Sequence, residues 1–240
     1  MKIEDDIKLE ALANLPTSVG PLLVSPLTLK EIIQYGYSKY SQVVQVALLT
    51  KEQLIKPEYL SQLSPQLSVA EIIFELFEDD LSSYLVDALR LFLKADVVHY
   101  KNNALYIDGL EVSSEDFNEI IRIIKIQNCL VTPNDEKFNP LNEHAARIKK
   151  KMLESKRKIQ ELGHDNINDQ SLSIFDLISI LSSHANGITI FNVFDLNMLQ
   201  FNDQFSRMKL LDEYEVNIQA LLHGADAKQI QLKHWISKLM

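Results

Sequence analysis

A pair of helical seams in the C-terminal half constrains this chain more than any other feature of its sequence. The first places apolar or small residues at alternating spacings of four and three, at Leu141, Ala145, Ile148, Met152, Ser155, Ile159 and Leu162. The second has the same rhythm and then drifts around the helix, through Phe194, Met198, Phe201, Phe205, Met208, Leu211, Ile218 and Leu222. Stripes this narrow are typical of helices that pack lengthwise against one other helix. They predict contact with a helix, in this chain or in another, and they do not predict a reaction.

The two seams carry opposite charge. Residues 141–162 hold seven basic and three acidic residues, a net +4, whereas residues 194–222 hold two basic and five acidic residues, a net −3. This opposition suggests that the seams pair antiparallel within one chain, which leaves part of the aromatic stripe or the last helix for a partner. A double charge reversal of Lys150 and Lys151 that changed neither stability nor partner binding would refute a role for charge at those positions.

The composition of the chain excludes several classes of protein. With 240 residues, 46% of them hydrophobic, the chain can bury a core without disulfides, and its single cysteine cannot form an internal one. No apolar run approaches the roughly 18 residues of a membrane span, and the acidic residues at 4–6 do not resemble a signal peptide. The net charge of −9 makes nucleic-acid binding unlikely, and the basic run at 147–158 contains no aromatic residue for base stacking.

The pattern of caps and turns predicts an N-terminal helical domain at 1–130. Two capping boxes, Thr28 with Glu31 and Ser68 with Glu71, should begin helices, and Gly36 should interrupt the first of them. Alternating apolar residues near 97–107, around an Asn-rich turn, predict a small β-hairpin and form the only convincing strand signal.

A proline-rich segment at 131–140 reads as a linker to a C-terminal helical domain at 141–240. Beyond the basic seam we expect an apolar helix at 172–185, a cap at Asn192 for the acidic seam, an end near Gly224 and a short last helix at 227–239. The predicted fold is therefore mainly α, multi-helical, with one small β-hairpin and a C-terminal helical bundle or hairpin.

Motifs for chemistry are missing from the sequence. The six glycines are never closer than 16 residues, which removes the dinucleotide fingerprint, the P-loop and the nucleophile elbow. The six histidines form no paired ligand motif, and the acidic clusters at 78–80 and 212–215 lack the spacing of a calcium loop. Cys129 follows an apolar helix and is interpreted as an inert structural thiol. We expect no enzyme, no catalytic residue, no cofactor and no metal.

The two seams therefore become the functional candidates. For the basic run, a solvated helix face is favoured over an acidic protein partner, and both are favoured over nucleic acid. For the acidic seam, internal core is the favoured interpretation and partner binding the second, because Phe and Met also line adaptable helix-binding surfaces. The candidate partner-binding residues are Phe194, Met198, Phe201, Phe205, Met208 and Trp235.

Several segments together resemble a family of tailed-bacteriophage proteins similar to the tail assembly chaperones encoded near the tape measure protein. They are Pro26–Ile33 with Gly36 and Tyr40, Asn139–Ala146, Ala185–Gly187, Asp203–Arg207, Leu222–Ala225 and Leu232–Trp235. The resemblance implies a non-enzymatic helper in the host cytoplasm that binds the tape measure or other tail proteins, with a homo-oligomer possible. The alternative is a structural component of the tail or baseplate. The family supplies no catalytic residue.

Overall fold

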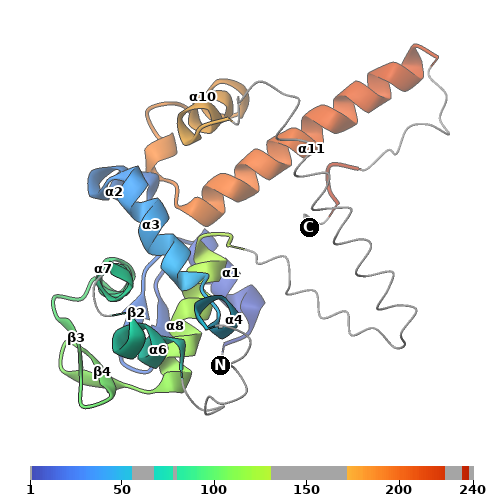
Figure 1. Cartoon of the computed structure of the whole chain (residues 1–240). Helices are drawn as coiled ribbons and strands as arrows, with labels where there is room; N and C mark the ends of the chain where they lie inside the picture. Colours follow the sequence, from blue (N-terminus) through green and yellow to red (C-terminus); the bar gives the residue numbers. More distant parts are fainter. Residues whose placement is uncertain (1, 56–67, 78–79, 131–171, 225–233, 238–240) are drawn as a thin grey trace, which may run out of the picture. The chain divides into compact units, whose positions relative to one another are not determined.

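The structure is a computed structural model that describes residues 2–55, 68–77, 80–130, 172–224 and 234–237 (Figure 1). The chain divides into two compact units, one made of residues 1–131 and 181–240 and the other of residues 132–180. The basic seam at 141–162, the linker at 131–140 and most of the expected helix at 227–239 lie outside the described residues. The division of the sequence into domains at 1–130 and 141–240 stays a prediction.

The described residues are mainly α-helical, which confirms the predicted fold class. In chain order the elements up to residue 130 are α1 (Glu4–Leu12), β1 (Thr17–Val19), β2 (Leu22–Val24), α2 (Leu29–Tyr35), α3 (Tyr37–Ala47), α4 (Lys51–Leu54), α6 (Val69–Leu76), α7 (Asp80–Leu93), β3 (Val98–Lys101), β4 (Ala104–Ile107), β5 (Leu110–Val112) and α8 (Ser114–Gln127). The later elements are α10 (Ile174–His184), the 3-10 turn η1 (Val193–Asp195) and α11 (Met198–Leu222).

Local capping sets where several helices begin. At the start of α2 the Thr28 hydroxyl accepts from the Glu31 amide, and the Glu31 carboxylate accepts from the Thr28 amide. Ser68 and Glu71 repeat this reciprocal arrangement at α6. Gly36 separates α2 from α3 and has a φ of 102°. A residue with a side chain would adopt this φ only with strain. Both predicted capping boxes and the predicted break are confirmed.

The predicted hairpin is present, but it belongs to a larger sheet. Strands β3, β4 and β5 form an antiparallel sheet in that order. Asn102 and Asn103, both at positive φ, make the two-residue turn between β3 and β4. Asp108 and Gly109 make the next turn in the same way, and the Asp108 carboxylate also accepts from the Val97 amide.

The expectation of a single hairpin was wrong, because β1 and β2 form a second one. Strands of three residues are too short to be recognised from alternating apolar and polar residues, and their burial depends on tertiary contacts. Thr17 and Val24 are both fully buried, and the Thr17 hydroxyl donates to the Glu10 carboxylate of α1 at 2.7 Å.

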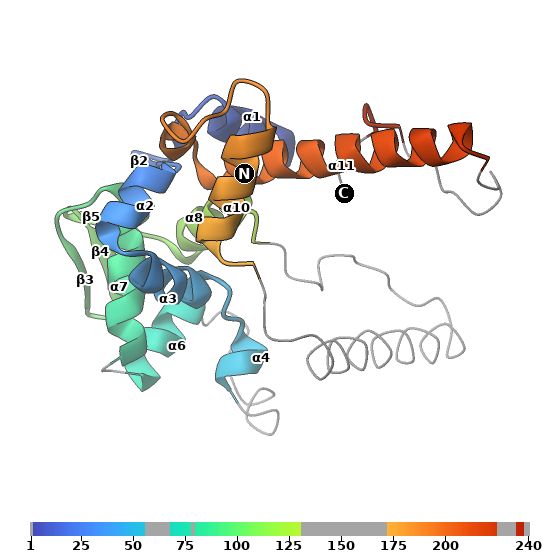
Figure 2. The ribbon, with the colours of Figure 1, turned by 90° about the horizontal axis from the view of Figure 1, so that it is seen from above.

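The core of the larger unit forms where α8 meets its neighbours. Phe117, Ile120 and Ile124 recur at helical spacing and are buried, so one face of α8 packs inward. Helix α1 and the β1–β2 hairpin contact α8, as Figure 1 shows. Helices α3 and α7 lie side by side (Figure 2), and Tyr40 of α3 donates to the Asn128 side chain at the end of α8.

Candidate partner-binding surface

Helix α11 carries most of the candidate residues, and its first turn is fixed by Asn197. The Asn197 side chain accepts from the Gln200 amide, and the Gln200 side chain accepts from the Asn197 amide, both at 2.9 Å. The expected cap, Asn192, was wrong, because η1 separates it from the helix. The sequence did contain the right signal, since Asn197 and Gln200 have the spacing of a capping box. The expected end of the helix near Gly224 is confirmed.

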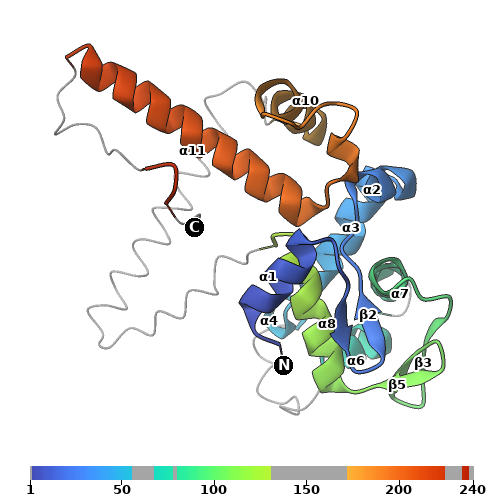
Figure 3. The same ribbon diagram turned by 180° about the vertical axis from the view of Figure 1, so that it is seen from behind.

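Asn197 also ties α11 to α1. Its side-chain nitrogen, Nδ2, donates to the Ala11 carbonyl at 2.7 Å and to the Asn14 side chain at 3.1 Å, and the residue is fully buried. Gln200 adds a bond to the Leu12 carbonyl at 2.8 Å. One turn of helix thus satisfies its own free amides and the carbonyls at the end of a second helix. Figure 3 shows this end of α11 at the ends of α1 and α8, with which it makes contacts.

A backbone bridge joins the same end of α11 to α2. The Leu29 amide donates to the Leu196 carbonyl at 2.8 Å, and Thr28 pairs with Asn197 in an isolated antiparallel bridge. Thr28 and Asn197 are the caps of their respective helices, so the bridge fixes where both helices begin. The start of α11 is therefore part of the folded body.

The predicted stripe residues differ in their environments. Phe201 is 1% exposed and belongs to the core. Phe205 and Met208 are half-buried on the same face, and the rings of Phe201 and Phe205 stack with centroids 6.2 Å apart. Met198 is half-buried in the first turn, whereas Phe194 lies in η1, before α11 begins. For Phe201 the favoured interpretation as core holds, and the stripe as a whole is not uniform.

Burial falls along the stripe toward the far end of α11. Leu211 is 38% exposed and Leu222 is 80% exposed, against 1% for Phe201. The drift of the apolar positions around the helix accounts for part of this change, because a helix packed on one straight neighbour loses contact with a drifting stripe. The distal residues leave apolar surface uncovered on a helix that is firmly held at its other end.

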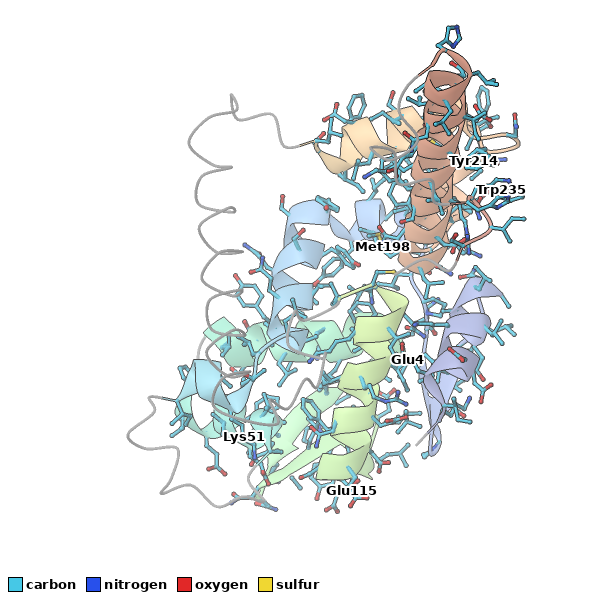
Figure 4. All side chains as sticks on the ribbon, turned by 90° about the vertical axis from the view of Figure 1, so that its right-hand side faces the viewer. Glu4, Lys51, Glu115, Met198, Tyr214 and Trp235 are labelled. Carbon is cyan, nitrogen blue, oxygen red and sulfur yellow. The ribbon has the colours of Figure 1, made fainter. Side chains whose placement is uncertain are left out.

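Trp235, the sixth candidate, lies beside the middle of α11. The Arg207 guanidinium donates to the Ser237 carbonyl at 2.7 Å and to the Trp235 carbonyl at 3.2 Å. The His234 ring packs at 5.0 Å from the ring of Tyr214. Because these contacts use backbone carbonyls and the histidine, the indole stays 46% exposed. Figure 4 shows Trp235 beside the stretch of α11 that carries Tyr214, with Met198 toward the other end of the helix.

Residues 234–237, which we call the tail, and the Phe201–Met208 stripe lie on different sides of α11. Arg207 and Tyr214 are seven residues apart and therefore share a face. Met208 follows Arg207 by one residue, which places it about 100° around the helix. Trp235 is thus brought to α11 but not onto the Phe201–Met208 face. Two adjoining apolar surfaces result, one on the helix and one on residues 234–237.

The distal half of α11 is acidic, as the sequence indicates. Glu213 and Glu215 are exposed, and Asp212 pairs with His184 of α10, with Oδ1 and Nε2 2.7 Å apart. Arg207 is engaged with the carbonyls of residues 235 and 237, which leaves Lys209 as the other basic residue of the helix. A partner at this surface would meet negative charge beside apolar side chains.

Metal sites, membrane-spanning helices and the single thiol can be assessed in the part of the chain that the structure describes. No group of three or more His, Cys, Asp or Glu residues there could hold a metal ion. None of the described helices is both long enough and apolar enough to cross a membrane. Cys129, interpreted from the sequence as an inert structural thiol, is exposed at the end of α8. Desolvation by nearby protein atoms raises the pKa of its thiol, which disfavours a reactive thiolate.

Comparison with known proteins gives a match for the region that contains this surface. Residues 166–240 match a family model described as the YomV second domain. YomV comes from a Bacillus prophage, so the match is to a phage-derived family, and it includes both α10 and α11. No curated protein and no solved structure matches the chain.

The YomV match covers less than half of the chain. It supports the phage origin implied by the sequence resemblance, and it says nothing of tail assembly or the tape measure. The matched region begins before α10 and includes both the anchored and the exposed ends of α11. The candidate surface therefore lies within the region that is similar to this phage-derived family.

Proposed function

We propose that this protein is a non-enzymatic phage tail morphogenesis protein, an assembly chaperone that binds the tape measure protein in the host cytoplasm. The observation that carries the proposal is the contrast along α11, where Phe201 is buried and Leu222 is 80% exposed. A chaperone of this kind needs an apolar surface that is presented by a rigid element and left free for another chain. The distal half of α11 meets both requirements.

The shape of the surface suits a helical client. A helix that presents apolar residues about every seven positions can pack lengthwise with an amphipathic helix of another protein. Met208 contributes a flexible thioether, which adapts to more than one partner sequence. The exposed indole of Trp235 adds the residue type that most often anchors protein interfaces.

The exposed acidic residues of α11 indicate which client helices should bind best. Because Glu213 and Glu215 are exposed beside the stripe, we expect the client helix to carry basic residues beside its own apolar stripe. Binding driven partly by these charges should weaken as salt rises, since exposed pairs are screened.

Co-expression tests the proposal directly. The large reading frame beside this gene in its phage genome, expected to encode the tape measure protein, is expressed alone and together with this chain. The soluble yield of the large protein should rise in the presence of this chain and should fall back with a Leu211→Asp, Leu222→Asp double variant. Leu23→Asp, on β2 and with 51% of the leucine exposed, is the matched control. Equal yields with and without this chain would refute the proposal.

Mass spectrometry of purified virions separates the chaperone from the alternative of a tail or baseplate component. A chaperone should be absent from finished particles, whereas a structural component should be present in a fixed number of copies. Recovery of this chain from particles at such a ratio would replace the proposed role with the structural one.

A further inference from the structure

The three-stranded sheet leaves one edge of β3 without a partner. In the order β3-β4-β5, strand β3 pairs on one side only, and Figure 1 shows it at the outer side of the sheet. The two-residue turn that follows Lys101 makes Lys101 and Ala104 a hydrogen-bonded pair. Such pairs alternate along an antiparallel ladder, so the backbones of His99 and Val97 also face β4. The Asp108 amide donates to the Val97 carbonyl at 2.8 Å, in agreement with this alternation.

The backbone groups of Val98 and Tyr100 therefore point away from the sheet. No described residue forms a hydrogen bond with the amide or the carbonyl of either residue. Unpaired groups of this kind are a template for an added strand. The opposite edge of the sheet, β5, is shorter and presents the backbone groups of Glu111 alone in this way.

Side-chain contacts hold the edge of β3 in place. Val98 is 6% exposed, and the ring of Tyr100 stacks on Phe74 of α6 with centroids 4.8 Å apart. The Tyr100 hydroxyl also donates to the Glu75 carboxylate at 3.2 Å. A strand fixed in this way loses little conformational freedom when another strand pairs with it. Strand β3 contains no proline and no β-bulge, two devices that commonly protect edge strands.

The charges along β3 suit an antiparallel copy of the same strand. Lys101 is exposed at the end of the strand, whereas Asp96 and Asp108 are exposed at its start, where the Asp108 carboxylate accepts from the Asp96 amide at 3.1 Å. Lys94 is engaged in an ion pair with α2. When two copies of β3 pair antiparallel, Lys101 of each lies opposite Val97 of the other and close to these carboxylates. The pairing is therefore complementary in charge.

The other acidic residues near β3 do not oppose this pairing. Glu71 and Glu75 lie near the Tyr100 hydroxyl. The Tyr100 side chain is on the face of the sheet opposite to that of Lys101, because successive side chains of a strand alternate. Glu111 lies on β5, and β4 separates it from β3.

We propose that β3 pairs antiparallel with β3 of a second copy of this chain, across a two-fold axis at His99. This register places Val98 of each copy opposite Tyr100 of the other, so the free edge groups bond to one another and the two sheets become one. The two His99 side chains meet at the axis, each stacked at 5.3 Å on the Tyr106 ring of its own copy. The interface does not involve α11 and does not depend on the proposed function.

Sedimentation of the full-length chain tests the proposal. A strand pair this short buries less than the area of a standard interface, so we expect a monomer at about 1 μM and a dimer at about 300 μM. His99→Glu and His99→Lys each place like charges face to face at the axis, so each should weaken dimerisation at least about fivefold. An equal mixture of the two variants should form a heterodimer with an affinity within about threefold of wild type. The matched control, Ser18→Glu at an exposed position on β1, should leave the affinity unchanged.

Residue-resolved amide exchange of the wild-type chain locates the interface without any substitution. The amides of Val98 and Tyr100 should exchange at least about tenfold more slowly at concentrations where the dimer forms than in the monomer. The Glu111 amide, on the opposite edge of the sheet, is the internal control and should exchange at the same rate in both states.

The outcomes separate loss of the interface from loss of the fold. Because His99 is exposed, both of its variants should melt at the wild-type temperature when they are monomeric. A monomer at every concentration would overturn the proposal. A dimer that both His99 variants retain at wild-type affinity, a mixture without a heterodimer, or protection that leaves out Val98 and Tyr100 would overturn it as well.

Discussion

The two ends of α11 present the same kind of apolar sequence in opposite situations. At the start, Asn197 and Phe201 are buried and the Asn197 side chain is hydrogen-bonded to α1, whereas at the end Leu222 is 80% exposed. The difference lies in what each end packs against, because the stripe continues through both. A repeat of apolar residues therefore identifies a helix that makes contacts, but not which of its turns are structural and which are free.

The largest expected effect is on stability, at the anchored end. Phe201→Ala removes a ring that is 1% exposed and leaves a cavity beside α1 and α8, which should cost about 3–5 kcal/mol in the free energy of unfolding. Denaturant unfolding measures it. The matched change Leu222→Ala should cost less than about 0.5 kcal/mol, since that side chain is exposed. Similar losses for both would remove the distinction between the two ends.

The cap should give the second largest effect. Asn197→Ala removes the bond to the Gln200 amide and one of the donors to the Ala11 carbonyl, which still accepts from the Asn14 amide, so we expect a loss of about 1–2 kcal/mol. Thermal unfolding measures the change. Asn118→Ala, an exposed position on α8, is the control and should change stability little. A loss under about 0.5 kcal/mol at position 197 would show that α11 is held mainly by other contacts.

At the exposed end the expected effect is on binding instead. Leu222→Asp should lower affinity for the client about tenfold, because it places a charge in an apolar contact, and should leave the melting temperature unchanged. Titration calorimetry with the client and a melting curve of the free chain measure both. A drop in melting temperature without a change in affinity would assign this end to the fold.

A smaller effect is expected where the tail meets the middle of α11. Arg207→Ala removes two donors to backbone carbonyls and should cost about 1 kcal/mol or less. The chain has one tryptophan, so the fluorescence anisotropy of Trp235 reports the release of residues 234–237 directly. Anisotropy should fall in Arg207→Ala and stay constant in Lys209→Ala. An unchanged anisotropy would show that Arg207 does not hold the tail.

The smallest expected effect is a loss of stability at acid pH, in the folded body that holds the start of α11. Hydrogen bonds from Arg122 lower the pKa of Glu119, so its stabilising contribution is present above the ordinary carboxyl pKa and is lost as pH falls below it. Between pH 6 and pH 3 we expect a loss of under about 1 kcal/mol from this pair, which Glu119→Gln should abolish. A pH profile of unfolding that is identical in both proteins would contradict this.

Local signals in the sequence predicted the parts of the fold that depend on neighbouring residues. The capping boxes at Thr28 and Ser68 and the break at Gly36 are set within four residues, and all are present. Strands β1 and β2 were missed because their pairing and burial depend on α1 and α8, which the sequence of three-residue strands cannot encode. The Asp-Gly pair at positions 108 and 109 is a readable signal for the turn that leads into β5, so this strand could be predicted from the sequence.

For the candidate surface, the sequence predicts which residues form the stripe but not how exposed each of them is. Phe201 and Leu222 look equivalent in the repeat, and only the contacts of Asn197 and Gln200 with α1 separate them. Trp235 was selected for its residue type, whereas its place beside α11 depends on Arg207, 28 residues away.

Hydrogen exchange along α11, followed by mass spectrometry in the free chain and with the tape measure protein bound, tests the central claim most directly. We predict slow exchange near Phe201 in both states. Near Leu222 we predict fast exchange in the free chain that becomes slow in the complex, because buried and anchored turns open rarely and uncovered ones open often. Uniformly slow exchange along the whole free helix, or no change near Leu222 on binding, would contradict the account.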